Sequence, residues 1–380
     1  MREIGVDPAG IEIMAPKTAS LLIKVDKLPL FAAHILKQET LSLGADTAVS
    51  REALTGKNKY TDCLIMGNLA HFRRLGEKLK RQPYKLSLLA VQLQEAIARY
   101  QRHNFILELG SCKLHLNSHT HIMGILNLTP DSFSKDGLRG ILEQVAYAQK
   151  LAQDGADIID IGGESTRPGA RPVSVKEELQ RVIPVLKKIR KKVRIPISID
   201  TYKAEVARQA LDNGAQIIND ITALNGDPKM AGVIKKYKAA VVLMHMKGSP
   251  QTMQKNPQYI HLMQEITAYL HQAITTALSV GISFEKIIVD PGIGFGKTEI
   301  HNLKIIQLLN QLRILGRPIM VGVSRKAFIG RITNEPISGR LAGGISSNCA
   351  AVEQGAKIVR VHDVKETKQA LAVLDSIQKC

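Results

Sequence analysis

Between residues 121 and 380, short apolar runs rich in Val and Ile alternate with longer segments of helical character. Each run ends on a polar side chain. Apolar runs of this kind, without strict alternation, are typical of parallel strands buried on both faces. The eight runs are HIMGILN, DIIDIGGE, IPISID, QIIN, AVVLMH, KIIVD, IMVGVSRK and KIVRVH, which end at Asn127, Glu164, Asp200, Asn219, His245, Asp290, Lys326 and His362.

Eight strands, each followed by a helix, predict an α/β fold of the (β/α)8 TIM barrel type. The expected helices lie at 142–154, 175–191, 203–213, 227–237, 259–280, 299–315, 341–354 and 365–378. Five of them stop near glycines suited to a helix C-cap, namely Gly155, Gly214, Gly281, Gly316 and Gly355. In this fold the active site lies where the strands end. The polar residues that close the eight runs fall at that end.

The first 118 residues have a mixed pattern that predicts a smaller α/β domain in front of the barrel. We expect a loose arm at 1–17, strands at 20–25 and 61–67, and helices at 30–42, 71–80 and 86–101. The last helix carries an apolar stripe that has to be buried, formed by Leu86, Leu89, Leu93 and Ile97. Residues 105–117 alternate and predict a hairpin that plugs the N-terminal mouth of the barrel. The boundary near 103–118 gives an accessory domain at 1–118 and a barrel domain at 119–380.

Composition limits the class of protein. With 380 residues, of which 44% are hydrophobic, the chain can bury a full core, and no apolar run approaches the ~20 residues that span a bilayer. The opening segment has two acids among its first seven residues and no continuous apolar stretch, unlike a signal peptide. The four cysteines are scattered without a CxxC pair. We therefore expect a soluble cytoplasmic protein that does not bind membranes.

The formal net charge of +18 raises the question of nucleic-acid binding. The excess is spread over both parts of the chain, with 17 Lys and Arg against 11 acids in residues 1–118 and 35 against 23 in residues 119–380. The chain has no Trp and only 4% aromatic residues, which argues against stacking on bases. An anionic substrate, or a general basic bias of the organism's proteins, explains the charge as well, and no nucleic-acid partner is expected.

Two long loops follow the first two barrel strands. One starts at Asn127 and contains Pro130, Gly137 and Gly140, and the other runs from Gly162 through two prolines. A packed connector in this fold usually needs only 2–6 residues. The extra length predicts lids that close over a substrate and exclude water, although simple connectors are the alternative.

The polar strand ends form two groups. Asp200, Asn219 and Asp290 offer donors and acceptors that fit a flat heterocycle with amino and lactam edges, and the two carboxylates also fit an acid/base pair or a metal site. Cations follow strands 7 and 8, where this fold usually binds phosphate: Ser324-Arg325-Lys326, and Arg360 with His362. With Asn127 as an oxygen ligand for Mg²⁺, this end predicts a pyrophosphate pocket. For Arg360 and His362, a buried salt bridge within the barrel is the alternative.

Two other motifs resemble known binding sites, but we expect neither to bind the corresponding ligand. The segment PGIGFGKT at 291–298 resembles a P-loop, but the first required glycine is Pro291. Its glycines instead predict close backbone approach to a ring. Cys112, His115, His119 and His121 have the chemistry of metal ligands. The histidines precede the first strand, at the wrong face of the barrel, and we expect them to be structural or solvated.

Eight motifs occur in order and with barrel spacing between about 121 and 380: MGILNLTPDSF, DIGGESTRPGA, SIDTYK, INDI, MHMKGSPQTMQ, DPGIGFGK, GVSRKAFIG and RVHDV. With these motifs the barrel resembles dihydropteroate synthase of folate biosynthesis. The resemblance implies a Mg²⁺-assisted condensation of 6-hydroxymethyl-7,8-dihydropterin pyrophosphate with p-aminobenzoate. It also implies that pyrophosphate leaves first and that the aryl amine attacks the resulting pterin methyl cation.

The resemblance also implies roles for single residues. Asp200, Asp290 and Lys326 match catalytic residues that contact the pterin, together with Asn219. Asn127 matches the metal ligand and, with Arg360 and His362, the pyrophosphate site. The positions that surround p-aminobenzoate are Phe133, Thr166, Pro168 and Ser324.

The chain departs from the family pattern in two places. The first loop reads SFSKDGLRG where SFSDGG is common, so Lys135 leaves the register of that lid open. The N-terminal 118 residues are not part of the usual enzyme and lack the signature of a pyrophosphokinase, and we expect them to serve packing or the assembly of a homodimer. The competing functions are a pterin-dependent methyltransferase and a non-catalytic pterin-binding protein.

Overall fold

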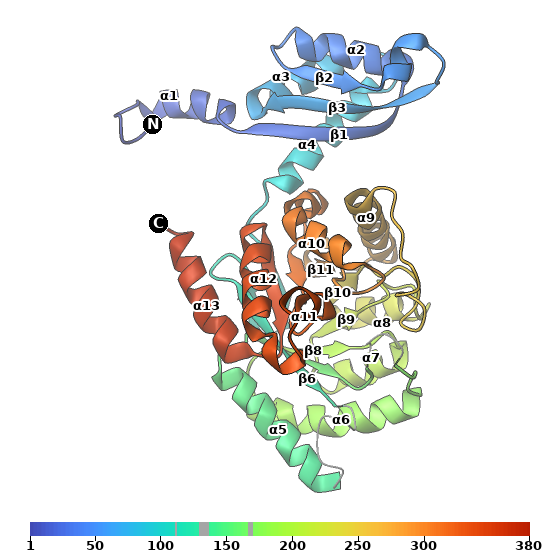
Figure 1. Cartoon of the computed structure of the whole chain (residues 1–380), viewed down its shortest axis with the longest axis vertical. Coiled ribbons are helices and arrows are strands. Elements are labelled where there is room, and N and C mark those ends of the chain that lie inside the picture. The colour runs from blue at the N-terminus through green and yellow to red at the C-terminus, as the bar shows by residue number, and fades with distance from the viewer. Residues whose placement is uncertain (111, 129–136, 166–169) are drawn as a thin grey trace. The chain divides into compact units, whose positions relative to one another are not determined.

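The computed structural model describes residues 1–110, 112–128, 137–165 and 170–380 (Figure 1). The chain divides into two compact units, Met1–Gln101 and Arg102–Cys380. The hairpin at 105–117 therefore belongs to the unit that contains the barrel. No helix within the described ranges is long and apolar enough to cross a membrane.

The second unit is a closed barrel of eight parallel strands. All eight predicted strands are confirmed. They are β6 (His121–Asn127), β7 (Ile158–Gly162), β8 (Ile197–Asp200), β9 (Ile217–Asp220), β10 (Ala240–Met244), β11 (Ile287–Asp290), β12 (Ile319–Val321) and β13 (Ala356–Val361). Nearly every residue of these strands is buried, which explains why the runs are continuously apolar.

Helices surround the barrel on its outside (Figure 1). They are α5 (Gly137–Gln153), α6 (Val175–Lys192), α7 (Ala204–Asp212), α8 (Met230–Tyr237), α9 (Leu262–Val280), α10 (Glu299–Gln307), α11 (Ala327–Thr333), α12 (Leu341–Glu353) and α13 (Val364–Ile377). The helix expected at 299–315 is divided, because its second half forms the 3-10 segment η4 (Leu309–Leu315). Helix α11 was not predicted. All five glycines that we expected to close helices have positive φ.

The strand register brings the polar strand ends together. Asn127 pairs with Gly162, Gly162 with Asp200, and Asp200 with Asn219 across four adjacent strands. These residues therefore lie in one layer at the C-terminal end of the barrel.

A hairpin closes the other end of the barrel. Its strands are β4 (Ile106–Leu109) and β5 (Cys112–His115). Side chains of the hairpin segment join one buried cluster with residues near the strand starts: Phe105, Leu107, Leu109, Leu116, Met123, Ile158, Ile217, Ala240, Val242, Ile288, Met320 and Ile358. The Gln216 side chain also donates a hydrogen bond to the Leu109 carbonyl over 2.8 Å. The predicted plug is confirmed.

We expect the plug to be required for barrel stability. A chain that starts at Arg102 keeps the hairpin, whereas a chain that starts at Ser118 loses its four buried apolar side chains, each contributing about 1.5–3 kcal/mol. The second truncation should lower the free energy of unfolding of the barrel by several times the effect of one such side chain. Urea denaturation of both chains measures the difference, and equal midpoints would show that the hairpin is dispensable.

The first unit is a small α/β domain, as predicted. Its sheet has the order β1-β3-β2, with strands β1 (Ser20–Pro29), β2 (Asp46–Val49) and β3 (Tyr60–Asn68). Helices α2 (Leu30–Leu41), α3 (Leu69–Leu79) and α4 (Leu86–Tyr100) accompany it. The apolar stripe of α4 packs within this unit, against residues such as Ile65 and Leu75. The arm expected to be loose contains a short helix, α1 (Pro8–Met14), capped by the Asp7 side chain.

Candidate active site

Three of the predicted site residues lie buried at or next to the C-terminal ends of their strands. Asp200 ends β8 with 6% of its surface exposed, Asn219 lies in β9 with 3%, and Asp290 ends β11 with 5%. Buried polar side chains are costly unless they have partners. Their position at the C-terminal face of a barrel therefore points to ligand binding.

Arg360 joins one of these carboxylates, Asp200, to a further buried carboxylate, Asp160. From β13 its guanidinium reaches across β6, so that Nε lies 2.6 Å from Asp160 Oδ2 and one Nη lies 2.8 Å from Asp200 Oδ2. The buried salt bridge that was the alternative interpretation of Arg360 is thus present. The Arg360 side chain is nevertheless 20% exposed, so it can also contact an anionic ligand.

Asp160 is a site residue that the sequence interpretation missed. It lies in the middle of β7 with no exposed surface, and its Oδ2 accepts a 3.1 Å hydrogen bond from the Asn219 side chain. Its position inside an otherwise apolar run was the feature of the sequence that could have identified it. Oδ1 of Asp160 and Oδ1 of Asp200 have no hydrogen-bond partner among the described residues. Two acceptor oxygens are therefore available to a ligand.

Burial dominates the electrostatics of the two predicted carboxylates. It raises the pKa of Asp200 to about 7, with the nearby Asp160 acting in the same direction, and the Arg360 charge offsets only part of the effect because Asp160 shares it. Burial also raises the pKa of Asp290, opposed by the Gly292 N–H, which donates to Asp290 Oδ1 over 2.6 Å. Both groups can therefore change protonation with a ligand.

Lys326 lies beside the glycine-rich segment that follows β11. Its amino group is 4.3 Å from the centre of the Phe295 ring, and a side chain at Gly294 would start 3.3 Å from the Lys326 stem. The glycines of this segment allow it to lie against the backbone that follows β10. A Cβ at Gly292 would lie 2.0 Å from the His245 carbonyl oxygen, and one at Gly296 would lie 2.4 Å from that of Lys247.

A second buried lysine holds this segment in place. Lys297 is 2% exposed, and its amino group lies 2.8 Å from His245 Nδ1 and 3.0 Å from the Phe295 carbonyl oxygen. Burial lowers the pKa of Lys297 to about 7 and also lowers that of His245. The sequence interpretation gave Lys297 no role.

The remaining predicted cations lie next to one another after β12 and β13. The Ser324 hydroxyl is 3.2 Å from His362 Nδ1 and accepts the His362 backbone N–H. Arg325 is paired with Asp363, with 3.1 Å between Nε and Oδ2. The structure thus brings Ser324 and His362 together, as expected, and directs Arg325 to a carboxylate of its own chain.

The two predicted lids are described only at their edges. Phe133, Thr166 and Pro168, expected around p-aminobenzoate, lie outside the described residues, and so does Lys135. At the start of the second loop, Lys203 forms ion pairs with Glu164 and Glu178, both of which are almost completely buried. This pairing anchors the described edge of the loop to the outer helices.

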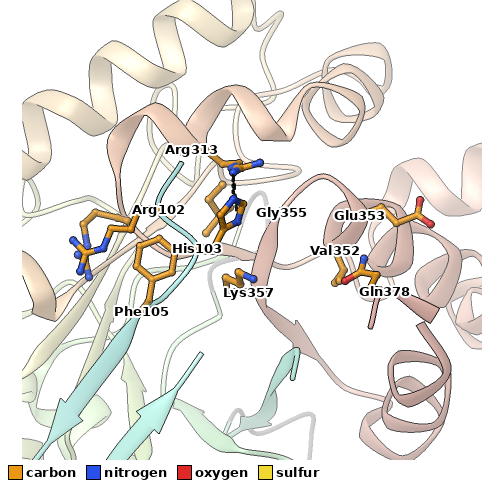
Figure 2. Close-up of a pocket in the computed structure, with 11 residues that line it drawn as sticks. Arg102, His103, Phe105, Arg313, Val352, Glu353, Gly355, Lys357 and Gln378 are labelled. Atoms are coloured by element: carbon orange, nitrogen blue, oxygen red, sulfur yellow. Dashed lines mark hydrogen bonds between the residues drawn. The ribbon is translucent and has the colours of Figure 1, made fainter. Parts of the chain in front are cut away.

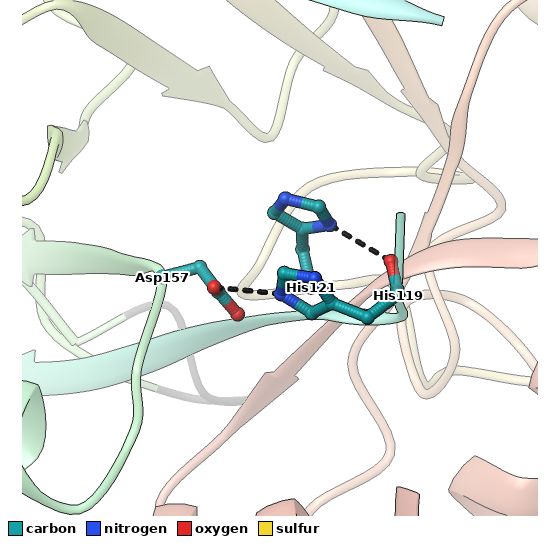
Figure 3. A group of neighbouring side chains, drawn as sticks. All are labelled: His119, His121 and Asp157. Atoms are coloured by element: carbon teal, nitrogen blue, oxygen red, sulfur yellow. Dashed lines mark hydrogen bonds and ion pairs between the residues drawn. The ribbon is translucent and has the colours of Figure 1, made fainter. Parts of the chain in front are cut away.

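The histidine motif lies at the opposite, N-terminal face, where His119, His121 and Asp157 lie close together (Figure 3). His119 Nε2 lies 2.9 Å from Asp157 Oδ1, while Asp157 Oδ2 accepts the Ile122 N–H over 2.8 Å. His121 Nδ1 lies 3.0 Å from the His119 carbonyl oxygen, and the two rings stack with centres 4.2 Å apart. These bonds join the starts of β6 and β7 and support a structural role, which stays a prediction.

The buried His121 should make the barrel sensitive to acid. Burial lowers its pKa from 6.5 to about 4, so the folded state binds a proton less readily than the unfolded chain, and stability is lost as the pH falls below 6.5. Between about pH 7 and pH 5 this group should cost about 2 kcal/mol. Urea midpoints measured across this range for His121→Asn should fall less steeply than for the wild type. The exposed control His271→Asn should keep the wild-type slope, and equal slopes for all three proteins would contradict the assignment.

Comparisons with known proteins agree with this geometry. The sequence model of the family described as "Pterin binding enzyme" matches residues 123–362. Dihydropteroate synthase of Synechocystis sp. is 44% identical over 273 residues, covering 71% of this chain and 94% of the relative. The Escherichia coli K12 enzyme of the same name is 45% identical over 260 residues, covering 68% and 92%.

A third relative extends over nearly the whole chain. It is a probable bifunctional folylpolyglutamate synthase/dihydropteroate synthase of Halobacterium salinarum, 40% identical over 376 residues, or 98% of this chain. The chain spans 44% of the length of that relative. The N-terminal unit thus has a counterpart in a longer protein.

Solved structures show the same barrel. Yersinia pestis dihydropteroate synthase in a sulfonamide drug complex is 40% identical with a TM-score of 0.69, covering 73% of this chain and all of that one. The Xanthomonas albilineans enzyme with 4-aminobenzoic acid is also 40% identical, with a TM-score of 0.69, covering 73% and 99%. The barrel, the buried polar layer and these similarities lead to one conclusion: the chain belongs to the dihydropteroate synthase family of pterin-binding enzymes.

Proposed function

We propose that the chain condenses 6-hydroxymethyl-7,8-dihydropterin pyrophosphate with p-aminobenzoate to give 7,8-dihydropteroate and pyrophosphate. The observation that carries this proposal is the buried layer in which Arg360 joins Asp160 and Asp200 while one oxygen of each carboxylate lacks a partner among the described residues. Acceptors for a pterin ring thus lie next to a cation for its pyrophosphate. The relatives named above support the same reaction.

The pterin is assigned to Asp200, Asn219, Asp290 and Lys326. Carboxylates accept hydrogen bonds from ring N–H and amino groups, and Lys326 donates to ring acceptors. When the C–O bond to pyrophosphate breaks, positive charge develops on the pterin methylene group. An ionised Asp200 stabilises that charge, and the aryl amine then forms the C–N bond and gives up a proton.

The leaving pyrophosphate is assigned to Arg360, His362 and Asn127. The arginine fork suits phosphate oxygens. Arg360 then has to share its charge between the ligand and the two carboxylates, which makes ligand binding sensitive to their protonation.

Mg²⁺ is proposed as the cofactor, with Asn127 as its ligand. The oxygen-rich surroundings fit this ion: a side chain at Gly162 would start 3.5 Å from Asn127 Oδ1 and 3.9 Å from Asp200 Oδ2, so the glycine leaves the space between these oxygens open. When bound, the ion neutralises the developing charge of the pyrophosphate.

The p-aminobenzoate is assigned to Ser324 together with Phe133, Thr166 and Pro168 in the loops. Because three of these four residues belong to the loops that follow Asn127 and Gly162 in the sequence, we expect p-aminobenzoate to bind after the pterin pyrophosphate. Calorimetry should detect p-aminobenzoate binding in the presence of pyrophosphate and Mg²⁺ and much weaker binding without them. Tight binding to the free enzyme would contradict this order.

The function is tested by pyrophosphate release in a coupled assay. We expect release only when both the pterin pyrophosphate and p-aminobenzoate are present. A methyltransferase or a non-catalytic pterin-binding protein releases none under these conditions. Absence of release from a folded protein that binds the pterin would overturn the proposal.

For the N-terminal unit we propose an accessory role in packing or in a homodimer, because every assigned residue lies at or after Asn127. A chain that starts at Arg102 should then keep its turnover, whereas its sedimentation shows whether the oligomeric state has changed. A folded but inactive truncation would assign this unit to catalysis. A cytoplasmic location stays a prediction.

A further inference from the structure

A cavity of about 350 Å³ lies at the N-terminal end of the barrel, away from the polar layer described above (Figure 2). Its walls come from the segment before β4, from η4, from the starts of β12 and β13, and from the ends of α12 and α13. The residues that matter for its chemistry are Arg102, His103, Arg313, Arg317, Glu353 and Lys357. Its volume falls within the ~300–1,000 Å³ range of small-molecule sites.

The lining has an excess of positive charge. Arg102, Arg313, Arg317 and Lys357 are cationic, and Glu353 is the acidic residue among the residues that line the cavity. Glu285 accepts from Arg102 over 2.7 Å and from Arg317 over 3.1 Å. One carboxylate thus serves two guanidinium groups, so the described residues of the wall carry a net positive charge.

Arg317 is held rigidly and incompletely satisfied. Its side chain is fully buried, Nε donates to the Ile287 carbonyl over 3.0 Å, and the guanidinium lies 4.5 Å from the centre of the Phe284 ring. Its Nη2 has no hydrogen-bond partner among the described residues. A buried charged donor without an acceptor is rare in native proteins and indicates a missing partner.

Arg313, His103 and Lys357 face one another in the same cavity (Figure 2). Arg313 Nη2 lies 2.8 Å from His103 Nε2, a contact that requires a neutral imidazole as acceptor. Burial, together with the charges of Arg313 and Lys357, lowers the pKa of His103. Lys357 has no carboxylate oxygen within ion-pair distance in the described chain, and burial and the Arg313 charge lower its pKa as well.

We propose that this cavity binds a small multivalent oxyanion, an organic phosphate or polycarboxylate, through Arg313, Lys357 and Arg317. Such a ligand supplies acceptors to all three side chains at once. The planar guanidinium group can form paired hydrogen bonds with either a phosphate or a carboxylate. The Phe105 ring and Val352 give part of the wall apolar character, so an organic ligand fits better than a bare ion. The site is separate from the proposed active site and does not depend on the proposed function.

The test must separate this cavity from the active site, which is also expected to bind anions. We therefore start from the full-length His362→Ala variant, in which the proposed pyrophosphate site of the barrel lacks one of its assigned residues, and titrate it with pyrophosphate and with citrate in Mg²⁺-free Tris buffer by calorimetry. Arg313→Gln and Lys357→Gln, each added to this variant, should weaken binding at least about 10-fold, as expected when one charged partner of an ion contact is removed. The exposed control Arg194→Gln removes the same charge elsewhere on the barrel and should leave binding unchanged.

The two probes identify the ligand class. Binding of pyrophosphate alone supports an organic phosphate, binding of citrate alone supports a polycarboxylate, and binding of both supports the shared oxyanion chemistry. Lys357→Gln keeps the proposal testable if Arg313→Gln does not fold. The proposal is overturned if neither probe binds, or if the cavity variants bind like the control.

Discussion

We expect Lys326→Ala to lower turnover at least ~100-fold while the barrel stays folded, because an oriented electrostatic group at an active site typically contributes about 2–4 kcal/mol to the barrier. The side chain lies at the C-terminal end of the barrel, beside Phe295, and is only partly buried. Asp200→Asn should have an effect of the same size, because the amide cannot stabilise a cationic pterin.

Steady-state pyrophosphate release measures both effects, with circular dichroism to show that the fold is kept. Lys187→Ala is a matched control, because it removes one exposed lysine of α6, on the outside of the barrel. If Lys326→Ala is soluble and turns over at the control's rate, Lys326 does not belong to the active site.

The largest expected effect on stability comes from Arg360→Gln. The change leaves Asp160 and Asp200 buried next to each other without their common counter-charge, and removing one partner of a buried ion pair typically costs about 3–5 kcal/mol. Without the guanidinium, the pKa of Asp200 should rise further above its unfolded value. The folded variant then binds a proton more readily than the unfolded chain, so the loss is fully present only at alkaline pH, above the raised pKa, and shrinks as the pH is lowered towards the wild-type pKa of about 7.

Urea denaturation of Arg360→Gln and the wild type at several pH values gives this difference directly. Arg325→Gln is the control, because Arg325 belongs to a half-exposed pair with Asp363 and should contribute less than about 1 kcal/mol. A loss in Arg360→Gln that is as small as in the control, or that grows towards acid pH, would mean that Arg360 does not neutralise the buried carboxylates.

The barrel could be predicted from the sequence because its strands are buried on both faces. Each strand is therefore a continuous apolar run, a pattern that exposed helices and strands do not have. The elements that were missed are short: α1 and α11 have seven residues each and β2 has four. Over so few positions, the periodicity of apolar residues does not distinguish a helix or strand from a loop.

The site was predicted where its residues end strands and missed where its chemistry depends on distant pairing. Asp160 lies within a run instead of at its end, and its partner Arg360 is 200 residues away in the sequence. Lys297 belongs to a recognised motif, but only the fold shows that its amino group is buried against His245. Pairings of this kind are decided by strand order around the barrel, which a local pattern does not contain.

The hairpin beneath the barrel has a consequence for how the chain is made. It leaves the ribosome before any barrel strand, yet its Leu107 packs in one cluster with Ile358, 251 residues later. The apolar face of the hairpin therefore has no complete partner surface until synthesis is nearly finished. Contacts between residues so distant in sequence form late and slowly. Until they form, the nascent chain exposes an apolar surface that can aggregate and that chaperones have to protect.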